Sequence, residues 1–158
     1  MSMNNSIFVD SSLLVEYLKN SRADLLDVLR NEPSTQLYIN QTVVSEYLFY
    51  HLGILGQKSP RTLKEIGAIS GVLSAVDPQP FLSLFVYLTD SPAMLPLTIQ
   101  FMSNYNLLPN DALILAACKH HGVPALASFD PDFSAACRGE GIQLVQSVAD
   151  FQIFKSAT

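Results

Sequence analysis

Four acidic residues lie along the chain at points where predicted secondary-structure elements begin or end. Asp10 closes the apolar run at 7–9, and Glu46 lies early in a helical pattern. Asp111 begins another helical pattern, and Asp130 follows a second apolar run. If the fold gathers these carboxylates, they repel one another unless a cation lies between them. Hard divalent cations such as Mg²⁺ prefer oxygen ligands and share their sites with phosphates, so the pattern points to phosphate chemistry.

Each acid also has a plainer interpretation when it is taken alone. An Asp after a strand is usually a helix cap or a turn former, which fits Asp10 and also Asp130 before Pro131. Asp132 fits a capping role equally well. Glu46 lies among aromatic and aliphatic neighbours, where an unpaired charge is costly to bury. It therefore either faces solvent or has a cationic partner, and a metal ion is one candidate.

Strands alternate with helices along the chain, which predicts an α/β fold with a central parallel sheet of four to five strands flanked by helices. Ligands of such sheets bind beyond the carboxyl ends of the strands, where Asp10 and Asp130 lie. Apolar periodicity and breaker residues set the expected boundaries. Strands are expected at about 6–10, 36–39, 94–97, 123–128 and 142–145, and helices at about 12–19, 21–31, 42–56, 60–75, 80–88, 98–105, 110–121, 131–138 and 148–154.

Several residues have the chemistry of helix ends. Ser11 or Ser12 is expected to cap the first helix, and Asn40 or Thr42 the helix that carries Glu46. Gly122 is expected to end the helix at 110–121. Asp111 then lies in the first turn of that helix, at the positive end of its dipole.

The composition describes a folded chain rather than a disordered one. The chain has 158 residues, of which 49% are hydrophobic and 15% charged, and this favours one domain spanning 1–158. No apolar run approaches the roughly 18 residues needed to span a bilayer. The N-terminus has no basic segment and no apolar signal core. Two cysteines, Cys118 and Cys137, are too few for a disulfide framework, and a reduced, cytoplasmic protein is expected.

The net charge of −5 argues against a protein that grips duplex DNA through a broad basic face, because phosphate affinity depends on Lys and Arg contacts. A nucleic-acid enzyme remains compatible with this charge, since a metal ion can supply positive charge at the reacting phosphate.

The motifs resemble the PIN-domain family of metal-dependent ribonucleases, and most closely its VapC-like members, the toxins of toxin–antitoxin pairs. The strand at 7–9 with Asp10 and two serines is similar to the family's opening motif. The segment 42–46 is similar to its helix-borne Glu, and 110–117 to its Asp-Ala helix. The segment 124–133 resembles its closing motif, with Ser128 where the family often has Thr. The four motifs occur in the family's order and cover most of the chain.

The resemblance implies a metal-dependent endoribonuclease that hydrolyses RNA phosphodiesters. It implies one or two Mg²⁺ or Mn²⁺ ions held by three carboxylates, those of Asp10, Asp111 and Asp130, with Glu46 and Asp132 close by. Hydroxyl groups would then hold metal waters or phosphate oxygens. The residues expected to support the site are Ser11, Ser12, Ser128 and Asn110, the last of which could equally be a helix cap.

The resemblance also implies partners, namely RNA, a cognate antitoxin and a second copy of the chain, with no membrane. A tRNA, a ribosomal RNA loop and a messenger RNA would all use the same acids, so the target stays open. The stretch 57–105 carries no recognisable motif and is apolar, which suits dimerisation or substrate choice.

Other functions fit the residues less well or in part. A catalytically silent PIN-fold scaffold that works through a partner or dimer would also explain the apolar composition. A phosphatase-like hydrolase needs Asp-x-Asp after the first strand, where this chain has Asp10, Ser11 and Ser12. A flap-type DNA nuclease needs a larger basic surface than nine Lys and Arg residues offer.

The aromatic and histidine side chains carry little functional signal. Tyr47, Phe49 and Tyr50 could stack on bases, but aromatic residues on an apolar helix usually belong to a core or a dimer interface. His51, His120 and His121 have no Ser or Cys nucleophile to pair with and are expected at the surface or at helix ends.

Overall fold

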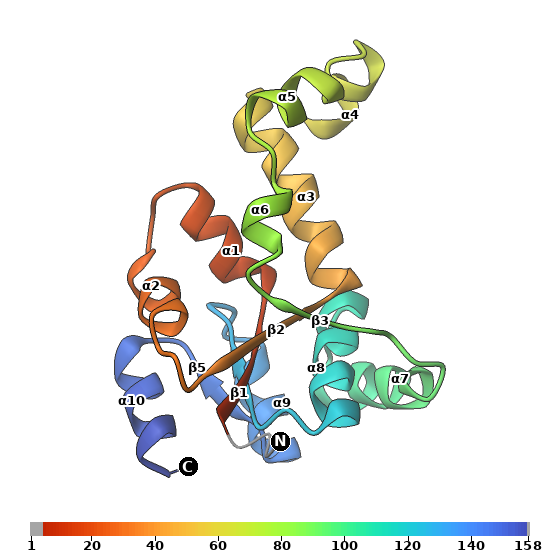
Figure 1. Ribbon diagram of the computed structural model, residues 1–158. Helices are drawn as coiled ribbons and strands as arrows, with labels where there is room; N and C mark the ends of the chain where they lie inside the picture. Colours follow the sequence, from red (N-terminus) through yellow and green to blue (C-terminus); the bar gives the residue numbers. More distant parts are fainter. Residues whose placement is uncertain (1–4, 158) are drawn as a thin grey trace.

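A five-stranded, all-parallel sheet forms the centre of the computed structural model, which describes residues 5–157 (Figure 1). The strand order is β3-β2-β1-β4-β5, so the first strand lies in the middle. This confirms the α/β prediction at its upper limit of five strands. The strands are β1 (Ser6–Val9), β2 (Gln36–Asn40), β3 (Val86–Leu88), β4 (Ala125–Ala127) and β5 (Gln143–Val145).

Helices flank the sheet, because each parallel strand must be reached by a crossover connection. The described residues form α1 (Ser11–Leu18), α2 (Asp24–Arg30), α3 (Gln41–Gly56), α4 (Pro60–Glu65), α5 (Ile69–Ala75), α6 (Gln79–Leu82), α7 (Met94–Tyr105), α8 (Pro109–His121), α9 (Phe133–Glu140) and α10 (Val148–Ala157).

The middle strands are covered on both faces. Every residue of β1 and β4 is buried, although successive side chains point to opposite faces of a sheet. Phe8 pairs with Tyr38 on one side and with Leu126 on the other. Burial on both sides explains why these strands are short continuous apolar runs rather than alternating patterns. It also fixes the carboxyl ends of β1 and β4 side by side.

The prediction for the region 77–97 was wrong in two places. The expected helix at 80–88 is the short helix α6 followed by the edge strand β3, and the expected strand at 94–97 is the first turn of α7. The side chains of Val86 and Tyr87 are exposed, so the run lacks the buried pattern of an inner strand. Pairing with β2, in which Leu88 lies opposite Asn40, decides its conformation.

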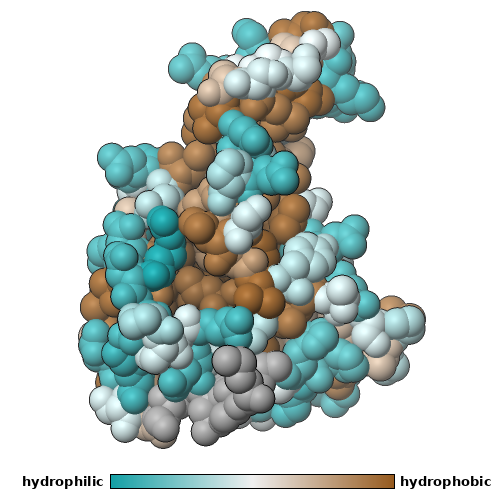
Figure 2. Space-filling model, viewed as in Figure 1, coloured by the Kyte–Doolittle hydropathy of each residue, from teal (hydrophilic) through white to brown (hydrophobic). Residues whose placement is uncertain are grey.

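The helices α3, α4 and α5 form an arm that rises away from the sheet (Figure 1). The single helix expected at 60–75 is two helices, because Gly67 adopts a left-handed φ of +69° between them. The arm carries apolar surface (Figure 2), including the exposed side chains of Phe49, Ile66 and Val76. Such surface on a protruding element is typical of an interaction site.

One histidine lies inside the arm rather than at the surface, contrary to the prediction. His51 is fully buried, and its Nε2 lies 2.9 Å from the carbonyl oxygen of Val76. The chain after α5 folds back over α3 and covers this ring, which the sequence does not reveal. His120 and His121 lie at the end of α8, as expected.

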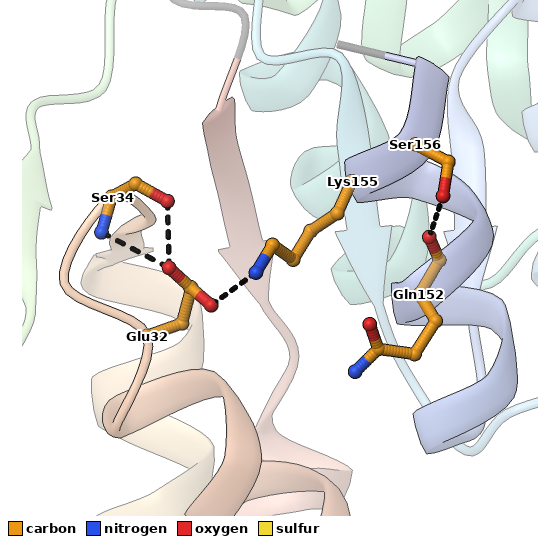
Figure 3. A network of polar contacts seen from close by, with 5 residues as sticks. All are labelled: Glu32, Ser34, Gln152, Lys155 and Ser156. Carbon is orange, nitrogen blue, oxygen red and sulfur yellow. Dashed lines mark hydrogen bonds and ion pairs between the residues drawn. The ribbon is translucent and has the colours of Figure 1, made fainter.

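The C-terminal helix is tied to the loop between α2 and β2 (Figure 3). Lys155 of α10 forms an ion pair with Glu32, whose carboxylate also accepts hydrogen bonds from the Ser34 backbone N–H and hydroxyl. Within α10, the hydroxyl of Ser156 donates to the carbonyl of Gln152. The Lys155–Glu32 ion pair holds α10 against the body of the protein.

Helix ends place the acidic residues. Asp10, rather than Ser11 or Ser12, caps α1, and its carboxylate accepts from the Ser12 N–H. Asn40 caps α3 as predicted, and Gly122 ends α8 with a φ of +67°.

Both cysteines are buried and free. Within residues 5–157, no helix has the length and apolar character needed to cross a bilayer.

Candidate active site

The four acids predicted from the sequence line one cavity of about 400 Å³ beyond the carboxyl ends of β1 and β4. They are the carboxylates of Asp10, Glu46, Asp111 and Asp130. β1 delivers Asp10 and β4 leads to Asp130, while the second turn of α3 carries Glu46 and the first turn of α8 carries Asp111. The fold therefore gathers four acids that the sequence spreads over more than a hundred residues.

Asp10 is the most deeply set of the four, with 4% of its surface exposed. Its Oδ2 accepts hydrogen bonds from the hydroxyls of Ser12 at 2.6 Å and Ser128 at 2.7 Å, besides the Ser12 N–H at 3.3 Å. Among residues 5–157, its Oδ1 has only a long contact of 3.5 Å with Ser11 Oγ. Burial raises the pKa of Asp10 despite these donors. The free lone pairs of Oδ1 are the ones available to a cation.

Glu46 is held by neutral donors from two other elements. Its Oε2 accepts from Ser11 Oγ and its Oε1 from Asn110 Nδ2, both at 2.7 Å. Asn110 is the second residue of α8 and does not cap it, since Leu108 occupies that position. The Asn110 amide thus orients Glu46 rather than a helix end. The hydrogen bonds from Ser11 and Asn110 explain how a glutamate is tolerated in an apolar helix.

Asp111 carries the clearest sign of crowded negative charge. Its pKa is raised from 3.8 to about 6, first by partial burial and then by repulsion from the other acids. The acids that repel it are Asp130, Asp10, Glu46 and Asp132, in decreasing order. A positive charge in the cavity would remove this cost.

Asp130 and Asp132 take different positions. Asp130 lines the cavity, and its N–H donates to Ser128 Oγ at 3.0 Å. Asp132 is exposed and is absent from the cavity lining, and its N–H donates to Asp130 Oδ1 at 2.9 Å. Asp132 therefore supports Asp130 through its backbone, while its own carboxylate acts on the cavity only at a distance.

The donor set suits a hard divalent cation. Among residues 5–157, no three acidic, histidine or cysteine side chains form a ready-made ligand set for one ion. Mg²⁺ does not require one, because it usually binds one or two carboxylates and keeps several waters. Carboxylates that repel one another in a cavity edged with serine hydroxyls match that mode of binding.

Other residues of the cavity were missed in the sequence. Glu16, Lys19, Arg22 and Phe129 were not among the expected site residues, yet all four line the cavity. Helical spacing contains part of the signal, because Ser12 and Glu16 of α1 and Lys19 at its C-cap are spaced i, i+4 and i+7 and share one face. For Arg22 and Phe129, the sequence contains no comparable signal. Tyr50 also lines the cavity, whereas Tyr47 is buried in the core.

Comparison with known proteins agrees with this architecture. The family model of the PIN domain matches residues 7–139. Ribonuclease VapC2 of Methanocaldococcus jannaschii is 30% identical over 131 residues, which cover 82% of this chain and 87% of the relative. Ribonuclease VapC6 of the same organism is 34% identical over 146 residues, covering 84% and 93%.

A solved structure extends the comparison to the fold. DNA-bound VapBC from Salmonella typhimurium aligns with a TM-score of 0.60 at 17% identity, covering 89% of this chain and 96% of that chain. The family model spans every element that delivers a carboxylate to the cavity, from β1 to the residues after β4. The resemblance found in the motifs is thereby confirmed, and the chain belongs to the PIN-domain family.

Proposed function

We propose that the protein is a metal-dependent endoribonuclease that hydrolyses RNA phosphodiesters. The observation that carries the proposal is the meeting of Asp10, Glu46, Asp111 and Asp130 in one cavity of a PIN domain. The two curated relatives are named ribonucleases, which supports RNA as the substrate.

Some residues of the chain would bind the cation, and others would orient the reactants. Asp10, Asp111 and Asp130 present oxygen ligands, with Ser12 and Ser128 fixing one oxygen of Asp10. Glu46, which is fixed by two hydrogen bonds, would orient the attacking water and accept its proton at a carboxylate oxygen. The water attacks phosphorus, the bond from phosphorus to one of its two ribose oxygens breaks, and that oxygen leaves and takes a proton from solvent water.

Mg²⁺ or Mn²⁺ is the proposed cofactor, bound by Asp10, Asp111 and Asp130. When bound, the ion would lower the pKa of water and offset the charge that develops on the phosphate oxygens. Asp132 is a weaker candidate ligand, because its carboxylate does not line the cavity.

The function is tested by incubating the purified protein with tRNA, ribosomal RNA and a mixed messenger RNA pool. Cleavage is expected with Mg²⁺ or Mn²⁺ and should stop when EDTA removes the ion, because the carboxylates alone repel the substrate. Product sizes on a denaturing gel are the measurement. Cleavage that persists in EDTA would refute the proposal, and absence of both cleavage and metal binding would favour a silent scaffold.

We also propose that the protein is the toxin of a toxin–antitoxin pair and that it forms a homodimer. Solved structures of similar fold include a toxin–antitoxin complex from Klebsiella pneumoniae, which aligns with a TM-score of 0.56 at 20% identity. Exposed apolar side chains on the arm and on α7 give surface for such partners, among them Phe49, Ile66, Val76, Leu95 and Ile99. Light scattering of the purified chain alone would separate monomer from dimer.

Asn110→Ala is expected to lower the rate of RNA cleavage by about tenfold, because a residue that orients a catalytic carboxylate contributes roughly that much. The substitution removes the 2.7 Å hydrogen bond that holds Glu46. Asn104→Ala is the matched control, since Asn104 is an exposed residue of α7 outside the cavity lining. Equal rates for the two variants would show that Glu46 needs no support from Asn110.

A further inference from the structure

We propose that Arg22 is a positioning residue that binds a phosphate of the RNA strand next to the scissile one, with Phe129 as its platform. The inference rests on the proposed function and names the part of the chain that would hold the substrate. Arg22 lines the same cavity as the four carboxylates. Its guanidinium carbon lies 3.6 Å from the centre of the Phe129 ring.

The stacking leaves the guanidinium free to bind an anion. A guanidinium that lies over an aromatic ring uses its face for that contact. Its N–H donors lie along its edge, in a fork that matches two oxygens of a phosphate. Phe129 therefore fixes the plane of the Arg22 head group without occupying its donors.

The charge of Arg22 is not offset by an ion pair in the part of the chain that the structure describes. Lys19, the other cation of the cavity lining, is paired with Glu16, because its Nζ lies 3.1 Å from Glu16 Oε1. The hydrogen bond from Lys19 is the main cause of the lowered pKa of Glu16, and the charge of Arg22 contributes least. The positive charge available to a substrate phosphate thus belongs mainly to Arg22. An unpaired cation beside an acidic cavity is expected where a polyanion must approach carboxylates.

The backbone sets the position of Arg22. The turn between α1 and α2 contains two non-glycine residues with left-handed conformations, Asn20 with a φ of 54° and Arg22 with a φ of 46°. Such conformations are uncommon for residues with a side chain and persist where surrounding contacts hold them. The turn places the Arg22 guanidinium over the Phe129 ring, although the residue as a whole stays exposed.

Phe129 is itself anchored to the acidic centre. Its N–H donates to Ser12 Oγ at 3.0 Å, and the same hydroxyl donates to Asp10 at 2.6 Å. Asp130 follows Phe129 directly in the chain. The distance from the platform to the carboxylates is therefore fixed by a few bonds, which is what a residue that sets substrate register requires.

The location of Arg22 distinguishes the flanking phosphate from the reacting one. Asp10 is buried, whereas Arg22 is exposed, so Arg22 lies at the mouth of the cavity. The reacting phosphate must approach the carboxylates and their cation. A strand bound there would continue past the mouth and bring its next phosphate to Arg22.

The test measures binding of a short, fluorescein-labelled single-stranded RNA of mixed sequence by anisotropy over a range of salt concentrations. Ca²⁺ takes the place of Mg²⁺, and a gel checks that the RNA stays intact. Arg22→Gln is expected to raise Kd about fivefold and to reduce the slope of log Kd against log salt by about 0.7, the value for one phosphate contact on a single strand. The KM for cleavage should rise with Kd while kcat changes less.

Further variants separate the stacked geometry from charge alone. Arg22→Lys keeps the charge but loses the planar fork, and Phe129→Leu keeps Arg22 but removes its platform. Each is expected to raise Kd about two- to threefold, less than Arg22→Gln. The control, Arg61→Gln, removes an exposed arginine of the arm that is paired with Glu65 and should leave Kd and the slope unchanged.

The outcomes distinguish this inference from the proposed function. If RNA is cleaved in a metal-dependent way but Arg22→Gln binds RNA like the wild type, the inference alone is wrong. Equal losses in Arg22→Gln and Arg61→Gln would also overturn it, because the effect would then be one of net charge. If the wild type neither binds nor cleaves RNA, the proposed function is refuted and the inference with it.

Discussion

Asp10→Asn is expected to lower kcat/KM for RNA cleavage by roughly a thousandfold, because the amide removes negative charge from the centre of the proposed cation site. The fold should be retained. The side-chain oxygen of asparagine can still accept hydrogen bonds from Ser12 and Ser128, the two residues that donate to Asp10. Burial raises the pKa of Asp10, which means that its charge is costly in the metal-free protein. The variant should therefore melt at the same temperature as the wild type or at a higher one.

The measurement is a cleavage time course with thermal unfolding of the same samples. Asp24→Asn is the matched control, since Asp24 is an exposed acid in the first turn of α2 and makes the same change in charge. The control should cleave RNA like the wild type. Full activity of Asp10→Asn in protein freed of contaminating nuclease would remove Asp10 from the catalytic site, and an unfolded variant would show that its role is structural.

Asp111→Asn is expected to reduce RNA cleavage by at least about a hundredfold while stabilising the metal-free protein at neutral pH. The pKa of Asp111 is raised from 3.8 to about 6, so its ionised form is disfavoured in the folded state. Replacing the carboxylate by a neutral amide should increase the free energy of unfolding by about 1 kcal/mol, since partial exposure reduces the full effect of such a shift. Loss of activity with a gain in stability is typical of a residue placed for function.

The pH dependence of this stabilisation has a definite sign. A raised pKa means that the folded protein binds the proton more tightly than the unfolded chain. Asp111 therefore lowers the stability of the metal-free wild type as the pH rises from near 4 to about 6. The difference between the variant and the wild type should be largest at pH 7 and should vanish at pH values below the ordinary value of 3.8.

Chemical denaturation in EDTA at several pH values measures this difference. Mg²⁺ should then stabilise the wild type more than Asp111→Asn, because the ion offsets repulsion that the variant has already lost. A difference in stability that is independent of pH would contradict the assigned cause. It would indicate that the substitution acts through packing or the α8 dipole instead.

The sequence determined the middle of the sheet and the acids at its edge. The apolar runs of β1 and β4 are continuous because both faces are buried, and each leads directly to an Asp. Asn40 and Gly122 mark helix ends through local chemistry that needs no distant partner. Parallel strands must present their carboxyl ends together, so the approach of Asp10 to Asp130 also follows from the sequence.

Tertiary contacts decided the conformation of segments in which the local sequence signal was weak. β3 is an edge strand with exposed side chains, and its apolar run fits a helix equally well until β2 pairs with it. The burial of His51 by the chain after α5 likewise depends on tertiary contacts. In both places the choice between alternatives depends on a surface supplied by another part of the chain, which periodicity does not record.

The candidate active site also combines features that the sequence determined with features that only tertiary contacts decided. Its four carboxylates could be named from the chain, because acids at strand ends and helix starts are locally visible. Supporting residues were also named, namely Ser11, Ser12, Ser128 and Asn110, but not the carboxylate that each one contacts: Asn110 reaches Glu46 across 64 positions. Arg22 was not named, and it reaches the ring of Phe129 from a turn with no motif. A hydrogen bond or a stacked pair depends on side-chain direction as well as on position along the chain. The sequence by itself thus determined which acids meet and which neutral residues lie near them, and only the tertiary structure decided which carboxylate each neutral residue orients and that Arg22 joins the site.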